Sequence, residues 1–562
     1  MKKLLLVITG LIFSMSGSSQ SWTYSNASGG RNNADGTLGL EKDASGNIYL
    51  LADFEGTRTF GVTTLTAIGF SDIYLTKFNS AGTRQWTIPI SGPFPNILEA
   101  TGVTCDAAGN VYVAGHFSYQ VSFGGGTTVL TNPAGNNDGF IAKFNSSGGF
   151  IWGKSLTGNG NERITAIEAS GTSIYICGSY TLSASFGSVS LAAPATALDD
   201  AFLIKLDSAG TGVWGKKGGG SAEDRALAIN ISNNNVYWAG YFNATGTFGG
   251  TNVVAVNNSS DMFIVKLDEQ GTQLWVKDYG GNWGEQINGV SQDPWGNPFC
   301  TGNFYGTVSF GTGMTIVEAY GMQPAGNGDA FIIKLNSSDG TCQWVRQIKC
   351  INGDNNELSA AISTDPGGSA YITGSFSGTT VFSTNTSQTG SSLSATNGKD
   401  AFVAKYGQTG TLLWVQKIGA TNNDNGKAVV WDTNGDCIVA GNFGGSLTIG
   451  SLPAISAAGS GISSQYVARY DGLSTGLTSF DSGIAFEVYP NPANDFITVL
   501  TSETLPISNY EIYGVNGSLL LSDQMSHRTS EIKLNVSDLK PGIYFLHITS
   551  GEEKGIKKIQ VN

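Results

Sequence analysis

One phrase recurs along most of this 562-residue chain and constrains its fold more than any other feature. It has the form D-x-[FY]-x-x-K, followed by a glycine and then a tryptophan, and Asp200 to Trp214 is a typical copy. Recurrence at a near-constant period is typical of stacked or radial architectures, so we expect an array of one structural unit. The six full copies begin at Asp72, Asp138, Asp200, Asp261, Asp329 and Asp400.

Each repeat contains four short runs that are rich in β-branched and aromatic residues, and residues 226–277 show all four. Turn residues bound the runs, as in the Asp43 to Gly46 segment, where glycine supplies the positive φ of a tight hairpin. With 78 glycines and only 13% charged residues, the composition also suits many short strands joined by tight turns. The sequence therefore predicts an all-β fold.

The two ends of the repeat array complement each other. The last repeat ends near Tyr470 without a tryptophan, whereas Trp22 stands at the start of the array without a repeat before it. We therefore expect a seven-bladed β-propeller over residues 21–472, closed by the N-terminal strand, although a linear solenoid could contain this split by accident. The second run of the unit occurs seven times, at Tyr49, Tyr112, Tyr175, Tyr237, Phe299, Tyr371 and Ile438.

The recurring phrase, with the D-x-x-G-N-x-Y-x-x-G segment that accompanies it, resembles the bacterial seven-bladed β-propeller repeat (SBBP-type) family of exported proteins. The resemblance covers about 450 residues and implies the propeller, but it implies no single activity. Two repeats depart from the pattern. Thr172-Ser173 replaces Gly-Asn in the third, and Ser464 and Arg469 replace Asp and Lys in the seventh, all at expected scaffold positions.

Two further segments flank the repeats. Residues 1–20 have a basic start, an apolar run and a small polar end, which predicts a signal peptide. Residues 473–484 are small and polar, as expected of a linker. Residues 485–562 alternate apolar and polar in six or seven short runs, which predicts a small β-sandwich.

Three motifs in this last segment resemble the type A C-terminal sorting domain of the type IX secretion system of Bacteroidetes. The resemblance implies export to the periplasm and then delivery by the outer-membrane translocon to the cell surface or the medium. The motif residues are Tyr489, Pro490, Asn491, Pro492, Pro541, Gly542, Tyr544, Lys557 and Lys558.

Charge and hydropathy exclude several partners. The net charge of −13 and the lack of a basic cluster in the repeats argue against nucleic-acid binding. No run after the signal peptide is long enough to be a transmembrane segment, so we expect an exported, monomeric propeller. Of the six cysteines, Cys342 and Cys350 form the one sequence-near pair that could bridge, and the others suit buried positions.

Histidine is scarce, with three in the chain and only His116 in the repeats. This scarcity excludes a multi-histidine zinc site and argues against histidine-dependent nucleophilic catalysis. We expect a structural or exposed role for His116. No cofactor is expected.

An acidic residue follows each repeat tryptophan by ten or thirteen positions, where one unit crosses to the next. Such a ring could hold a cation such as calcium or form an electronegative channel mouth. A scaffold role, in which each acid accepts backbone N–H bonds and joins neighbouring units, is the preferred hypothesis because every unit has one. The seven residues are Asp35, Glu99, Glu162, Asp224, Glu285, Glu357 and Asp424.

Two tryptophans outside the repeat pattern, Trp283 and Trp295, are candidates for exposed contact with a ligand. The function favoured by the sequence is a non-enzymatic secreted or surface protein that binds a glycan or a protein. An extracellular polysaccharide hydrolase or lyase with loop carboxylates is the first alternative, and a structural spacer or adhesin component is the second. A deep pocket that holds two carboxylates would favour the enzyme.

Overall fold

The computed structural model divides the chain into two compact units, Ser21–Gly472 and a second unit that contains Leu473–Asn562. The predicted signal peptide and linker lie outside the residues that the structure describes. The described residues are 21–29, 36–60, 62–126, 129–192, 198–311, 313–317, 328–352, 358–384, 389–419, 422–432, 436–450, 452, 454–456, 463–471, 486–501, 506–514, 519–550 and 553–562.

Each repeat folds as a four-stranded antiparallel sheet in the order of the sequence. In the third repeat, β14 (Glu162–Ser170), β15 (Ser173–Tyr180), β18 (Asp200–Asp207) and β19 (Gly212–Gly220) pair in turn. These strands correspond to the four runs that the sequence predicted. The recurring phrase is therefore the third and fourth strand of the unit.

The same order of four strands recurs in the other six repeats. The first strands are β2 (Thr37–Lys42), β8 (Leu98–Cys105), β20 (Arg225–Ser232), β26 (Gln286–Gln292), β32 (Leu358–Thr364) and β36 (Asn425–Trp431). The second strands are β3 (Ile48–Phe54), β9 (Val111–Phe117), β21 (Asn235–Asn243), β27 (Pro298–Phe304), β33 (Ala370–Ser383) and β37 (Cys437–Gly444). The third strands are β6 (Asp72–Phe78), β12 (Asp138–Phe144), β24 (Ser260–Asp268), β30 (Asp329–Leu335), β34 (Gly390–Tyr406) and β40 (Ser463–Asp471). The fourth strands are β7 (Arg84–Ser91), β13 (Phe150–Gly158), β25 (Gln273–Gly281), β31 (Cys342–Asn352), β35 (Leu412–Ile418) and, for the last repeat, β1 (Ser21–Gly29).

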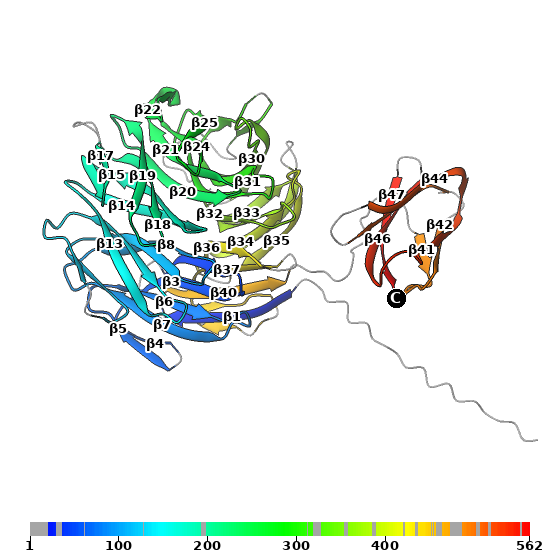
Figure 1. The fold of residues 1–562 in the computed structure, drawn as a ribbon, viewed down its shortest axis with the longest axis horizontal. Helices are drawn as coiled ribbons and strands as arrows, with labels where there is room; N and C mark the ends of the chain where they lie inside the picture. The colour runs from blue at the N-terminus through cyan, green and yellow to red at the C-terminus, as the bar shows by residue number, and fades with distance from the viewer. Residues whose placement is uncertain are drawn as a thin grey trace, which may run out of the picture. The chain divides into compact units, whose positions relative to one another are not determined.

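The N-terminal strand completes the last sheet. β1 pairs antiparallel with β40, from Ser21 opposite Asp471 to Gly29 opposite Ser464. Figure 1 shows the dark blue β1 beside the gold β40, so the first and last strands of this unit are neighbours. The pairing that Trp22 predicted is therefore present.

A hairpin that the sequence analysis did not anticipate lies between the second and third strands. In most repeats one of its strands pairs with the fourth strand of the preceding repeat, as β10 does with β7. In the sixth repeat the outer parts of β33 and β34 take this place. The hairpins are β4 (Thr57–Phe60) with β5 (Thr63–Thr66), β10 (Gln120–Phe123) with β11 (Val129–Thr131), β16 (Ser183–Phe186) with β17 (Val189–Ala192), β22 (Thr245–Phe248) with β23 (Thr251–Val254), β28 (Thr307–Ser309) with β29 (Thr315–Val317), and β38 (Ser446–Leu447) with β39 (Ile455–Ser456).

The hydrophobic core lies between neighbouring sheets. One buried cluster joins Tyr175 and Leu203 of the third repeat to Trp238 and Phe263 of the fourth. Sheets that pack face to face in succession around a common centre form a β-propeller (Figure 1). Among the described residues there is no α-helix, and Val256–Asn258 forms a short 3-10 turn, η1.

The C-terminal unit has two sheets over one core. β41 (Phe486–Tyr489), β42 (Phe496–Thr501) and β45 (Glu531–Asn535) form the first sheet. The second has the order β44 (Leu519–Thr529), β43 (Ile507–Gly514), β46 (Gly542–Ser550) and β47 (Glu553–Val561). Side chains of both sheets, such as Ile497 and Leu546, share a single buried cluster.

Cys342 and Cys350, the pair that could bridge, are not joined by a disulfide. Neither unit has, in its described residues, a helix of the length and apolar character that a membrane span needs.

Candidate functional site: the central cavity

A cavity of about 770 Å³ lies at the centre of the first unit, and the first strand of every repeat contributes to its wall. Each of these strands has a β-bulge at the same place. A bulge adds one unpaired residue to a strand and re-aims its side chain. In every repeat this extra residue lines the cavity: Leu38, Thr101, Thr165, Leu227, Asn288, Ala360 and Lys427.

Small residues after the bulges bring the first strands close together. A Cβ atom at Gly102 would lie 3.0 Å from Ile167 Cγ2 in the next repeat, and one at Gly289 would lie 3.0 Å from Ile362 Cγ2. The Thr101 hydroxyl donates to the Ile164 carbonyl oxygen of the next repeat at 2.7 Å. The cavity wall is therefore a continuous, closely packed ring. A sequence pattern marks these bulges, because every bulge residue is followed by Gly or Ala and then by Val, Ile or Leu. This pattern could have predicted the cavity-lining positions.

Two carboxylates share this cavity. Glu41 of β2 and Glu168 of β14 both line it, and the Cys105 thiol of β8 donates to Glu41 Oε1 at 4.0 Å. Burial raises the pKa of Glu41 to about 7. Burial also raises the pKa of Glu168 well above its usual value, and the Glu41 charge adds to this rise. No sequence motif marks Glu41 or Glu168, so this pair was not predicted from the sequence.

The predicted carboxylate ring lies elsewhere. Asp35 and Glu357 are outside the described residues. Glu162, Asp224, Glu285 and Asp424 are buried where their repeats begin, and none of them lines the cavity.

The contacts of the buried acids join neighbouring repeats. Asp224 Oδ2 accepts the backbone N–H of Gly220 in the preceding repeat at 2.8 Å, and its Oδ1 accepts that of Asn243 at 3.0 Å. Glu285 Oε2 accepts the Gly281 N–H at 3.1 Å in the same way. Such contacts support the scaffold hypothesis for this part of the ring.

Each of three buried acids also lies beside the aspartate of the preceding D-x-F-x-x-K phrase. Burial raises the pKa of Glu285 to about 9, and the charge of Asp261 adds to the rise. The pKa of Asp261 itself is raised by burial to about 6. Glu162 with Asp138 and Asp224 with Asp200 repeat the arrangement. Among the described residues, no three His, Cys, Asp or Glu side chains form a group that could hold a metal ion.

Glu99 is not equivalent to these acids. In the third repeat, Glu162 pairs with Tyr180, and Tyr180 in turn pairs with Asp200, the aspartate of the recurring phrase. In the second repeat, Phe117 pairs with the equivalent Asp138, but the residue opposite Phe117 on the first strand is Leu98 and not Glu99. A shift of one residue turns a side chain to the other face of a strand. The Glu99 side chain is consequently 64% exposed, and its Oε2 lies 3.4 Å from Nε2 of the buried His116.

The recurring lysine and tryptophan of the phrase contact the next repeat, as expected of scaffold residues. Lys77 Nζ and Trp86 Nε1 both donate to the carbonyl oxygen of Ser146, each at 3.2 Å. The Trp86 ring also packs against Gly148, where a Cβ would lie 3.1 Å from its Cδ2. Trp275 and Lys266 make the same pair of contacts to Ser337.

The two candidate aromatic contacts differ. Trp283 is half-buried against Gly306, where a Cβ would lie 2.5 Å from its Cδ1. Trp295 is 59% exposed and sits in the turn between β26 and β27, whose Asp293 and Pro294 line the cavity. Trp295 therefore lies beside the cavity on an exposed turn.

The sorting motifs meet at one edge of the C-terminal unit. Asn491 Nδ2 donates to the Lys558 carbonyl oxygen at 2.9 Å, and Asn491 Oδ1 accepts the Gln560 N–H at 2.8 Å. Gly542 pairs with Val561, next to the same strand end. The Tyr489 and Lys558 side chains are exposed, so they are accessible to a partner.

Comparison with known proteins identifies this second unit. Residues 487–562 match the secretion system C-terminal sorting domain. The chain is therefore handled as a type IX secretion substrate and is secreted to the cell surface or the extracellular space.

The repeats have more distant relatives. A WD repeat-containing protein of Acanthamoeba polyphaga mimivirus, described as uncharacterized, is 25% identical over 450 residues, which cover 68% of this chain and 32% of that protein. The chain thus spans about a third of the relative's length. The WD40 β-propeller domain of Doa1 aligns with a TM-score of 0.41 at 10% identity, over 81% of this chain and 98% of that one. A chain of the mitotic checkpoint complex aligns with a TM-score of 0.39 at 8% identity, over 78% and 95%.

Proposed function

We propose that residues 21–472 form a seven-bladed propeller of the bacterial repeat family, in a Bacteroidetes protein that the type IX secretion system exports and that binds a glycan or a protein ligand. The observation that carries this proposal is the central cavity of about 770 Å³. Its volume falls in the range of about 300–1,000 Å³ typical of ligand pockets. The C-terminal β-sandwich serves delivery, which leaves the propeller free for the extracellular task.

The cavity wall is unlike a repeated scaffold. Its bulge residues include the apolar Leu38, the amide Asn288 and the cation Lys427, and Glu41 and Glu168 add carboxyl groups on one side. A scaffold role would favour the same residue in every repeat. A wall with a different group on each side suits one ligand in one orientation, held by a few polar contacts.

Binding assays on the full exported chain test this proposal. Leu227→Trp would fill the cavity from a bulge position, whereas Val213→Trp adds the same bulk at an exposed position of β19. We expect the wild type and Val213→Trp to bind a glycan or surface protein, and Leu227→Trp to bind at least about tenfold more weakly. Equal binding by both variants would exclude the cavity, and a wild type that binds nothing would favour a spacer or adhesin role.

A polysaccharide hydrolase is the second candidate, because two carboxyl groups with raised pKa values share one cavity. A glycosidase needs one protonated carboxyl as acid and one ionised carboxylate as base or nucleophile. Burial raises the pKa of Glu41 to about 7 and also raises that of Glu168, so one of the two would serve as the acid and the other as the carboxylate.

The hydrolase candidate has its own test. Reducing-end release from a panel of polysaccharides should be abolished by Glu41→Gln and by Glu168→Gln, while Glu99→Gln, outside the cavity, should retain it. Binding without any release of reducing ends would exclude the hydrolase and leave the binding protein.

A further inference from the structure

Trp295 breaks the repeat pattern at an exposed place. The residue two positions after the turn aspartate is Ser45, Ala108 or Gly367 in the other described turns of this type, but in the fifth repeat it is Trp295. Its indole is 59% exposed. An exposed tryptophan in a turn where small residues serve other repeats has no packing role that the fold requires, and aromatic residues of this kind often dominate binding sites.

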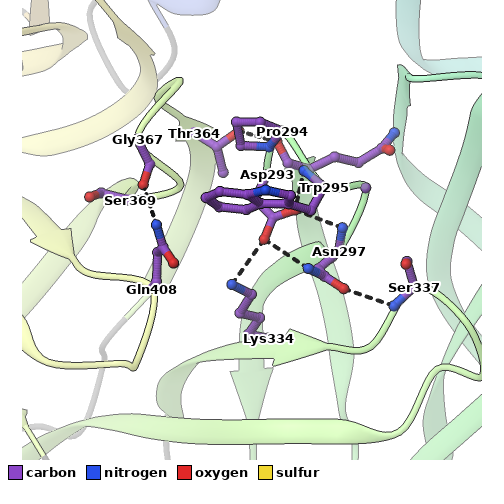
Figure 2. A network of polar contacts seen from close by, with 12 residues as sticks. Asp293, Pro294, Trp295, Asn297, Lys334, Ser337, Thr364, Gly367, Ser369 and Gln408 are labelled. Atoms are coloured by element: carbon purple, nitrogen blue, oxygen red, sulfur yellow. Dashed lines mark hydrogen bonds and ion pairs between the residues drawn. The ribbon is translucent and has the colours of Figure 1, made fainter. Parts of the chain in front are cut away.

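The turn that carries Trp295 is rigid. Asp293 Oδ1 accepts the backbone N–H groups of Trp295 at 3.0 Å and of Asn297 at 2.8 Å. Asp293 Oδ2 accepts Asn297 Nδ2 at 3.0 Å and pairs with Lys334 Nζ at 2.9 Å. Figure 2 shows this network beneath the indole. A rigid turn lowers the entropy lost when a ligand orders its site.

The next repeat fixes the indole from the side. A Cβ at Gly368 would lie 2.6 Å from Trp295 Cζ3, so the ring lies against the backbone of that turn. Gln408 Nε2 donates to the Gly367 carbonyl oxygen at 2.6 Å and holds the turn in place (Figure 2). The ring is therefore braced at one edge while more than half of its surface remains in solvent.

The residues labelled around the indole in Figure 2 are mostly polar, and the charged ones among them are Asp293 and Lys334. Asp293 and Lys334 neutralise each other and are both buried. The other labelled groups near the ring in Figure 2 include the Gln408 amide and the Ser369 and Thr364 hydroxyl-bearing residues. Pro294 and Thr364 belong to the cavity wall, so the indole of Trp295 adjoins the cavity.

We propose that Trp295 is a stacking platform for a neutral sugar ring of a glycan whose adjoining part enters the central cavity. The apolar C–H face of a hexose matches an indole face, and its hydroxyls match neighbouring amides and hydroxyls. A single braced aromatic among neutral polar groups fits one sugar ring better than a protein surface, which needs a contiguous interface of about 800 Å². The assignment rests on the proposed function, since it names the ligand class for the same end of the propeller.

The test compares Trp295→Ala and Trp295→Phe with the wild-type full chain on soluble neutral glycans (β-glucan and α-mannan) and acidic ones (alginate and polygalacturonate). Phe94→Ala is the matched control, because Phe94 is another exposed aromatic but precedes a first strand, at the other end of the propeller. We expect the wild type and Phe94→Ala to bind a neutral glycan. Trp295→Ala should bind at least about tenfold more weakly, and Trp295→Phe should be intermediate. Binding should also change the tryptophan fluorescence of the wild type but not that of Trp295→Phe.

Each of the other outcomes would contradict the proposal that Trp295 stacks on a neutral sugar. If Trp295→Ala binds a neutral glycan as the wild type does, while Leu227→Trp does not, the cavity function stands and the platform is wrong. If the wild type binds only acidic glycans or only proteins, the neutral sugar is the wrong ligand. If the wild type binds none of these, both the platform and the proposed binding function fail. Melting curves of all variants show whether a loss reflects misfolding.

Discussion

The indole N–H of Trp214 donates to the carbonyl oxygen of Glu269, 55 residues further along the chain and in the next repeat, at 3.2 Å. Lys205 Nζ donates to the same oxygen at 2.9 Å. Lys205 and Trp214 therefore both contact the neighbouring sheet, and their side chains also lie against Tyr175 of their own sheet. The phrase recurs because the same lysine and tryptophan contacts join each repeat to the next.

Trp214→Phe should remove one hydrogen bond and keep most of the packing. We expect a loss of about 1 kcal/mol in the free energy of unfolding, measured with denaturant. Trp152→Phe is the matched control, since the Trp152 ring packs on Gly210 but its indole has no hydrogen bond among the described residues. An equal loss in both variants would show that the indole hydrogen bond contributes nothing.

Deleting residues 21–29 should open the last sheet along β40. Eight residue pairs are lost, and at about 0.5–1 kcal/mol for each net hydrogen bond the cost is on the order of 5 kcal/mol. Calorimetry should record a clearly lower Tm. A chain in which an unrelated polar segment of equal length replaces residues 21–29 controls for shortening, and an unchanged Tm in either chain would refute the closure.

Glu285 should make the propeller less stable as the pH rises. Its folded pKa of about 9 is above the value of the unfolded chain, so its contribution to stability is complete below about pH 4.5 and is lost progressively up to about pH 9. Glu285→Gln removes this titration. Between pH 5 and pH 9, the urea concentration at the unfolding midpoint of Glu285→Gln should therefore rise relative to that of the wild type as the pH increases.

Asp339→Asn is the control for this pH series, because the Asp339 side chain is exposed and hydrogen bonds from Thr341 hold its pKa below the ordinary value, so it stays ionised between pH 5 and pH 9. We expect its urea midpoints to follow those of the wild type. A pH-independent difference between Glu285→Gln and the wild type would mean that Glu285 does not ionise in the measured range.

Removing residues 487–562 should stop delivery, since this segment is the sorting domain. Immunoblots of cell fractions should find the truncated chain within the cell envelope and nearly none at the surface or in the medium. Asn491→Ala, which loses the contacts to Lys558 and Gln560, should reduce delivery without abolishing it. Undiminished delivery of the truncated chain would contradict the sorting role.

The sequence predicted the order of strands and the pairing of the two ends because Trp22 lacked a repeat of its own. It did not reveal the hairpins between second and third strands, since runs such as Val129–Thr131 are too short to show alternation. A recurrent phenylalanine followed by glycine was the available signal. These phenylalanines, such as Phe123, Phe186 and Phe248, are buried at the hairpins.

The site was harder to predict than the fold. Glu41 and Glu168 lie more than a hundred residues apart and meet only because the ring brings their strands to one cavity. Glu99 was predicted to belong to the carboxylate ring because it follows Trp86 by thirteen residues. The strand register instead places Leu98 at that position. Local spacing specifies faces of a strand, whereas the bulges that shape the cavity depend on pairing between strands.

The pairing of β1 with β40 also means that the last sheet can close only after the whole propeller has been synthesised. β1 leaves the ribosome more than four hundred residues before its partner strand exists. Until then β1 has no strand to pair with, and the sheet of β36 and β37 lacks its outer strands. We therefore expect the newly made chain to stay loosely folded until its last repeat is complete, which is the condition in which a polypeptide can pass through a narrow export channel.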